Sequence, residues 1–273
     1  MSLLLRKSLL LPSALLAVSL GACTTLGPMP ATTGISMAPA GRPEVEVRGG
    51  YVPGYFLSSA VREEASGAPL REVGAIIEPD RLLHLPGVFV GARYAGSPDE
   101  GAALEPTLGY RAALGAEGQL GLGVVGYGTH ASGSDKRASF EATRAGLEVG
   151  GDYRLTARYE YVELHANASA ALTGVTSSGR YCSDATGKYG TDCPDEPNAV
   201  TNTSANAGGL YPSVSAGLSL DFARHLDSAF HGVRLGLGVS GGTMPRVIAG
   251  QQASPRTYAA AGGTLSVAFG AAR

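Results

Sequence analysis

The sequence predicts an all-β fold, an antiparallel up-and-down meander of about eight strands closed into a β-barrel. Between residues 86 and 269, apolar side chains alternate with small or polar ones at the period of two that a strand imposes. The connections between these segments alternate between long and short. The chain holds 40 glycines among 273 residues and no tryptophan. Many of these glycines lie inside alternating segments, where glycine weakens an ordinary strand, so one face of the strands must need small residues.

Composition excludes several classes of protein. A formal net charge of -2 and a pI of about 6.2 provide no concentrated basic field, so we expect no nucleic-acid partner. The only long apolar stretch lies at the N-terminus and is too short for a comfortable membrane-spanning helix. No glycine-rich phosphate loop, HExxH motif or metal-ligand cluster is recognisable, so we predict neither a cofactor nor a metal.

The first 22 residues have the features of an export signal: basic Arg6 and Lys7, an apolar stretch and small residues before Cys23. The sequence Leu-Gly-Ala-Cys at residues 20–23 resembles the lipobox of bacterial lipoproteins, which implies that Cys23 becomes a lipidated N-terminus. Cleavage farther on, near Ala31, is the alternative. Residues 23–44, rich in Thr, Pro, Gly and Ala, are predicted to be a flexible linker.

Residues 45–85 have no clear period, and we leave their structure open. The eight predicted strands follow, with residues 270–273 as a tail. They cover residues 87–96, 107–115, 119–130, 140–149, 153–166, 211–222, 230–242 and 258–270. The connections after the first, third, fifth and seventh strands are long, and those after the second, fourth and sixth are short. This is the plan of an outer-membrane barrel with both termini on the periplasmic side, where a lipid on Cys23 would also lie.

The orientation of the two strand faces decides between a soluble and a membrane barrel. With the branched residues inside, as in a soluble calyx, glycines such as Gly236 and Gly238 would face water with nothing gained. With the branched residues toward lipid, the glycines line a narrow lumen and leave room for larger polar neighbours. We therefore predict a transmembrane barrel of the outer-membrane type, with Val233, Leu235, Leu237 and Val239 facing lipid.

The charged residues favour the same orientation, because they share the glycine and serine face and an arginine facing lipid would cost roughly 2–4 kcal/mol. The predicted lumen charges are Arg93, Arg111, Arg144, Glu148, Arg154, Arg158, Glu160, Asp221 and Arg234. An ordinary solvated face of a soluble sheet is the alternative. A periplasmic lipoprotein whose soluble barrel binds an apolar ligand therefore stays open as a competing interpretation.

The pattern over residues 86–269 resembles that of small outer-membrane barrels, without a motif that identifies one family. Tyr94, Tyr110, Tyr153, Tyr159 and Tyr161 suit the aromatic girdles at the membrane interfaces. The final strand is similar to the C-terminal assembly signal of such barrels, although here Phe269 is followed by four more residues.

Two cysteines lie in the long polar stretch after the fifth predicted strand. Cys182 and Cys193 are separated by a short loop that contains no histidine, which favours a disulfide over a metal site. Such a bridge would brace an external loop.

One short pattern suggests catalysis. His130, Ser132 and Glu141 resemble the His-x-Ser and glutamate arrangement of outer-membrane lipid A deacylases. His165 and Asn167 are expected to be solvated residues at the rim of the barrel.

The leading prediction is a non-enzymatic outer-membrane barrel with a structural or surface-interaction role through its long external loops. Its predicted partners are membrane lipid and an external ligand or surface partner. A narrow lumen lined by alternating arginine and glutamate is expected to be closed. A lipid A hydrolase is the third interpretation.

Overall fold

The computed structural model describes residues 45–53, 55–58, 63–66, 70–78, 85–97, 101–115, 119–134, 138–156, 162–183, 201–222, 229–248 and 251–270. Nearly all of these residues are in β-strands. No helix among them is long and apolar enough to span a membrane.

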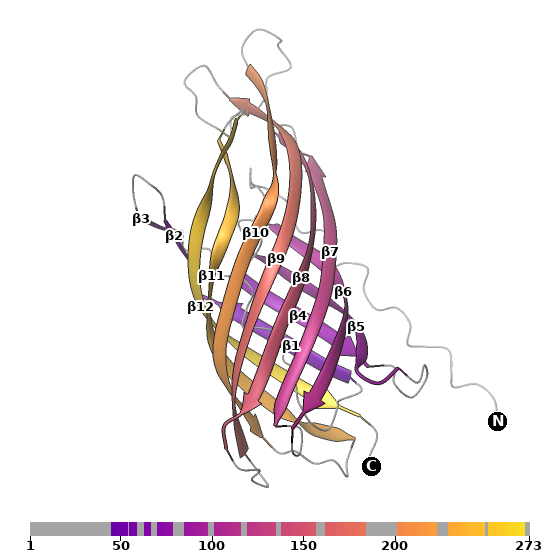
Figure 1. The fold of residues 1–273 in the computed structure, drawn as a ribbon. Coiled ribbons are helices and arrows are strands. Elements are labelled where there is room, and N and C mark those ends of the chain that lie inside the picture. The colour runs from indigo at the N-terminus through magenta and orange to yellow at the C-terminus, as the bar shows by residue number, and fades with distance from the viewer. Residues whose placement is uncertain are drawn as a thin grey trace, which may run out of the picture.

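The strands form a closed antiparallel barrel in which neighbours in sequence are neighbours in the wall (Figure 1). The wall has ten strands, because β1 pairs with β4 on one side and with β12 on the other. The predicted meander and its closure are confirmed, but the expected count of about eight is wrong. The wall strands are β1 (Val45–Val52), β4 (Leu70–Ile77), β5 (Val88–Ser97), β6 (Gly101–Leu114), β7 (Leu120–Ser134), β8 (Ala138–Arg154), β9 (Val162–Ser183), β10 (Thr201–Phe222), β11 (Phe230–Ile248) and β12 (Gln251–Phe269).

The two additional wall strands come from residues 45–85, where the pattern was too short to interpret. Between β1 and β4 lies a hairpin of β2 (Tyr55–Ser58) and β3 (Glu63–Ser66). β2 pairs with β12 at Thr257–Ala260, beyond the stretch of β12 that pairs with β1. The hairpin therefore prolongs β1 and β4, and Figure 1 shows it standing out at the side of the barrel.

The fifth predicted strand, residues 153–166, is wrong. β8 continues through the presumed turn at Gly150–Asp152 to Arg154, and the next strand, β9, begins at Val162. Gly150 pairs in register with Ser169 of β9, so the glycine is an interior strand position. The error arose because adjacent glycines are typical of turns, whereas here they are consecutive strand residues, with Gly150 on the inner face of the barrel.

The strands are also longer than expected at the end of the barrel opposite the start of β1 and the end of β12, which we call the far end. β9 and β10 have 22 residues each, and β11 and β12 have 19 each. Residues 241–256, predicted to be a long loop, are mostly strand. The other end, where β1 begins and β12 ends, is the terminal end. Polar segments that were predicted to be loops therefore lengthen the strands of the wall at the far end.

The outer face of the wall is apolar. Leu235, Leu237 and Val239 of β11 are 47%, 73% and 59% exposed, and Val233 is half-buried on the same face. Every wall strand contributes to this apolar belt. Other exposed members are Val47, Val73, Ile77, Val90, Leu104, Leu108, Leu114, Leu122, Leu147, Val149, Leu172, Leu210, Val214, Leu218, Leu220, Leu265 and Phe269.

Glycines on the inner face give space to aromatic rings from neighbouring strands. A Cβ atom on Gly109 would lie 2.3 Å from Cζ of Phe89, and one on Gly146 would lie 2.5 Å from the hydroxyl of Tyr127. Neither glycine can therefore be replaced without moving a neighbouring ring, which gives a physical reason for glycine in these strands.

Candidate functional site: the charged interior of the barrel

Most of the charged side chains that the structure describes lie in the interior of the barrel. Six arginines and eight carboxylates lie there, all buried except Arg93 and Asp221, which are half-buried. They are Arg48, Arg93, Arg111, Arg144, Arg154 and Arg234 with Glu46, Glu72, Glu78, Glu105, Glu148, Asp152, Glu163 and Asp221. Because buried charges are costly unless they are paired, their contacts decide what this interior can do.

Glu105 of β6 is the centre of one group. Its carboxylate is completely buried and lies between two guanidinium groups. The Nε atom of Arg93 donates to Oε2 of Glu105 at 2.6 Å, and Arg144 donates to Oε1. Arg93 also lies over the ring of Tyr127, with 5.4 Å from Cζ to the ring centroid. The group links β5, β6, β7 and β8.

A second group lies toward the terminal end on β4, β5 and β6. Glu78 accepts hydrogen bonds from Nε and Nη2 of Arg111 at 3.0 and 2.7 Å, and from the backbone N–H of Gly87 at 3.0 Å. The guanidinium of Arg111 also stacks near Phe89, with 5.7 Å from Cζ to the ring centroid. Glu78 thereby ties the connection between β4 and β5 to the wall.

The third group occupies the terminal end of β8, β9, β10 and β11. Nη1 of Arg234 donates to Oδ2 of Asp152 at 2.6 Å. Nε and Nη2 of the same arginine donate to Oδ1 and Oδ2 of Asp221. His165 is completely buried, and its Nδ1 lies 2.6 Å from Oδ1 of Asp152. The prediction that His165 is a solvated rim residue is therefore wrong, because β9 begins at Val162 and His165 lies near its start at the terminal end, not near the outer end of a strand.

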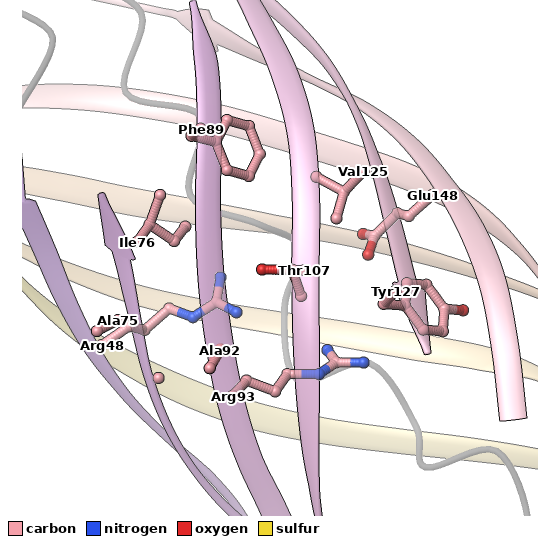
Figure 2. A pocket seen from close by; sticks show the side chains of 11 residues that line it. Arg48, Ala75, Ile76, Phe89, Ala92, Arg93, Thr107, Val125, Tyr127 and Glu148 are labelled. Atoms are coloured by element: carbon pink, nitrogen blue, oxygen red, sulfur yellow. The ribbon is translucent and has the colours of Figure 1, made fainter. Parts of the chain in front are cut away.

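Little open space remains between these groups. The cavity shown in Figure 2 has about 20 Å³ available to water centres, room for about one water molecule. Arg48, Phe89, Arg93, Tyr127 and Glu148 from four different strands are among the residues that line it. A cavity of this size does not by itself form a continuous path for water.

Seven of the nine charges predicted for the lumen lie in this interior: Arg93, Arg111, Arg144, Glu148, Arg154, Asp221 and Arg234. Arg158 and Glu160 lie outside the described residues. The pattern missed Glu105, because the predicted strand began at residue 107. If that strand had begun two residues earlier, alternation from Thr107 would have placed Glu105 on the inner face. It also missed Asp152 and Glu163, because both fall at the wrongly placed turn and strand.

The three candidate catalytic residues lie near the far end of β7 and β8. His130 is exposed, and its Nδ1 lies 3.0 Å from Oγ1 of Thr143. The backbone of Ser132 pairs directly with that of Glu141, two positions beyond the pair of His130 and Thr143. The side chains of Ser132 and Glu141 lie outside the described part of the chain.

Tyr94, Tyr110 and Tyr153 are exposed on the outer face, whereas Tyr159 and Tyr161 are not described. Cys182 lies near the far end of β9, where its backbone pairs with Asn202. Cys23 and Cys193 are outside the described residues, so lipidation and the disulfide stay predictions.

No protein-family model and no curated protein matches the chain. Among solved structures, Neisserial surface protein A is 12% identical, with 83% of this chain and 97% of that chain covered and a TM-score of 0.32. The outer membrane protease OmpT from Escherichia coli is 9% identical, with 88% and 100% covered and a TM-score of 0.43. Ail, the attachment invasion locus protein of Yersinia pestis, is 10% identical, with 82% and 99% covered and a TM-score of 0.28. The fold assignment given above rests on the strand pairing of this chain itself.

Proposed function

We propose that this chain is a bacterial outer-membrane β-barrel, closed by its own ion pairs, that acts through its strand ends and connections outside the membrane. The proposal rests on the distribution of polar and apolar side chains, which is the reverse of that in a soluble protein. Leu237 is 73% exposed on the outside, whereas Glu105 is fully buried inside. A soluble barrel would bury the leucine and expose the carboxylate, so this burial supports a membrane barrel over a soluble barrel that binds an apolar ligand.

The height of the apolar belt supports a bilayer as its surroundings. On β9 and β10 the outward-facing apolar or alanine positions run from Val162 to Leu172 and from Phe222 to Leu210. This stretch matches the roughly 9–11 residues that a tilted strand needs to cross a membrane. Beyond it, β9 continues as TGVTSSGRYCS and β10 begins with TNTSANAGG, both poor in large apolar residues.

These polar halves would stand outside the membrane. About eleven residues at roughly 3.3 Å each extend the hairpin by about 36 Å along the strand direction. With both termini on the periplasmic side, this hairpin faces the surroundings of the cell and offers a surface to an external ligand or partner. The packed interior argues against a conducting pore.

Two labelling variants test this placement. Thr176→Cys lies above the belt and Ala168→Cys lies within it; both positions are exposed on β9. With Cys182 and Cys193 replaced by serine, we expect a membrane-impermeant maleimide to label Thr176→Cys on intact cells. Ala168→Cys should react only after unfolding. Labelling of both positions only after the outer membrane is permeabilised would refute the placement.

Two measurements on the membrane fraction accompany the labelling. The unheated protein should migrate differently in SDS from the heated one, because a closed barrel leaves no strand edge unpaired. In planar bilayers it should show no stable conductance steps, and steady channels would refute the closed interior. Lipidation is tested by incorporation of labelled palmitate, which should disappear in Cys23→Ser.

A lipid A hydrolase is a second candidate function, supported by the register that aligns Ser132 with Glu141 next to exposed His130. All three positions lie just beyond the belt, where an enzyme acting on external lipid would need them. The test is the acylation of lipid A by mass spectrometry in cells with the wild-type chain, His130→Ala or Thr143→Ala. Loss of a deacylated species in His130→Ala alone would support this function, and identical lipid A in all strains would exclude it.

A further inference from the structure

We propose that Glu163, His165 and Asp221 bind a divalent transition-metal ion of the zinc type inside the barrel at its terminal end. Glu163 and His165 are two residues apart on β9, and Asp221 lies opposite on β10, where it pairs in register with Glu163. The three side chains offer two carboxylate oxygens and one imidazole nitrogen within 4.8 Å of one another.

The distances at the Nε2 atom of His165 suit metal ligands better than hydrogen bonds. Nε2 lies 3.4 Å from Oε2 of Glu163 and 3.6 Å from Oδ2 of Asp221. Good hydrogen bonds to a ring nitrogen measure about 2.7–3.2 Å. Two ligands bound tetrahedrally to one zinc ion at about 2.0–2.1 Å lie roughly 3.4 Å apart. The other ring nitrogen, Nδ1, makes a normal short contact of 2.6 Å with Asp152.

Each of the three side chains also contacts a partner outside the cluster, and for Asp221 this partner donates to both carboxylate oxygens. Asp152 contacts Nδ1 of His165 with Oδ1 and accepts a hydrogen bond from Arg234 with Oδ2. The same arginine holds Asp221 by two hydrogen bonds. Arg154 lies 3.6 Å from Oε1 of Glu163, on the side away from His165. A carboxylate behind a ligating histidine is the usual support of a protein metal site, since it fixes the ring and its tautomer.

The charge of the interior supports a divalent cation. With neutral histidines, the six arginines and eight carboxylates of the described interior have a formal net charge of -2. One divalent ion would neutralise this charge, and at the cluster itself the carboxylates of Asp152, Glu163 and Asp221 outnumber the guanidinium groups of Arg154 and Arg234 by one. An imidazole ligand favours zinc and related transition metals over calcium and magnesium, which prefer oxygen ligands alone.

Such an ion would brace the terminal end of the barrel. It would join β9 to β10 directly, and through Asp152 and Arg234 it would also engage β8 and β11. Three protein ligands leave a fourth position for water.

The experiment uses full-length protein, folded in detergent without a polyhistidine tag, with Cys182 and Cys193 replaced by serine and EDTA removed by dialysis. Equilibrium dialysis against Zn²⁺ should give one ion per chain. His165→Ala should lose this binding, and Asp152→Asn should weaken it about 10–100-fold. His231→Ala is the matched control, because His231 is also buried near the terminal end but outside the cluster.

A second measurement separates a metal site from a simple ion-pair network. Zn²⁺ should raise the temperature at which the unheated SDS mobility is lost, in wild type and His231→Ala but not in His165→Ala. Absence of stoichiometric binding to the folded wild type would overturn the proposal. Equal binding by His165→Ala would do the same, as would an equal effect of Mg²⁺.

Discussion

Replacing Glu105 by glutamine should destabilise the barrel strongly while preserving its shape. The carboxylate is fully buried between the guanidinium groups of Arg93 and Arg144, with 2.6 Å from Nε of Arg93 to Oε2. Glutamine has nearly the same volume but no charge, so two buried cations lose a shared anion. Removing one partner of a buried ion pair costs about 3–5 kcal/mol, a large part of the stability of about 5–15 kcal/mol typical of a folded protein.

The assay is equilibrium unfolding by urea in lipid vesicles, followed by the fraction that retains the mobility of the unheated form in SDS. Because the chain lacks tryptophan, this gel readout is preferable to fluorescence. We expect the free energy of unfolding to fall by about 3–5 kcal/mol in Glu105→Gln. The double variant Glu105→Gln with Arg144→Met should recover part of the loss, since one of the two unpaired cations is removed. A loss below about 1 kcal/mol, or no recovery in the double variant, would refute the view that this ion-pair group stabilises the interior.

Two further substitutions test the two faces of the wall with the same assay. Leu235→Arg places a charge on the apolar belt and should cost about 2–4 kcal/mol, whereas Thr176→Arg, on the outer face above the belt, should leave the free energy of unfolding nearly unchanged. A harmless Leu235→Arg would show that this face does not meet lipid. Gly109→Ala would put a Cβ 2.3 Å from the ring of Phe89 and should cost about 1–3 kcal/mol through overpacking. Gly126→Ala is its control, because the nearest atom to the new Cβ would be 3.7 Å away; equal losses in the two variants would contradict the steric explanation.

Which side chains of each strand face inward could be predicted from the sequence, because the alternation of inward and outward residues is a local property of the strand. Arg93, Arg111 and Arg234 each follow from the parity of their own strand, without knowledge of its neighbours. The exposed side chains of Leu235 and Leu237 follow in the same way. Because side chains in a strand alternate with a period of two, one residue whose direction is known fixes the direction of all the others in that strand.

The strand boundaries could not be predicted, because they depend on pairing between distant segments. Gly150 has the local character of a turn residue, and only its pairing with Ser169 shows that the strand continues. His165 was expected at a rim because the preceding turn was misplaced. Its burial depends on Asp152 of the neighbouring strand. Asp152, one of the partners of Arg234, is 82 positions away in the chain and leaves no local signal.

The correction from eight to ten strands changes what the interior glycines achieve. A barrel of ten strands is wider, so small residues all round would leave an open channel. Midway along β9 to β12 the inward-facing side chains are small. Ser169 and Ser215 are examples, and their hydroxyl oxygens lie 2.7 Å apart. The opposite wall contributes the long side chains of Arg48, Arg93 and Tyr127. Large side chains from one wall thus fill the space that small residues leave along the other, and their ion pairs hold them there. We therefore expect the charged interior to keep the barrel closed, and we expect changes at the polar strand ends to open no channel.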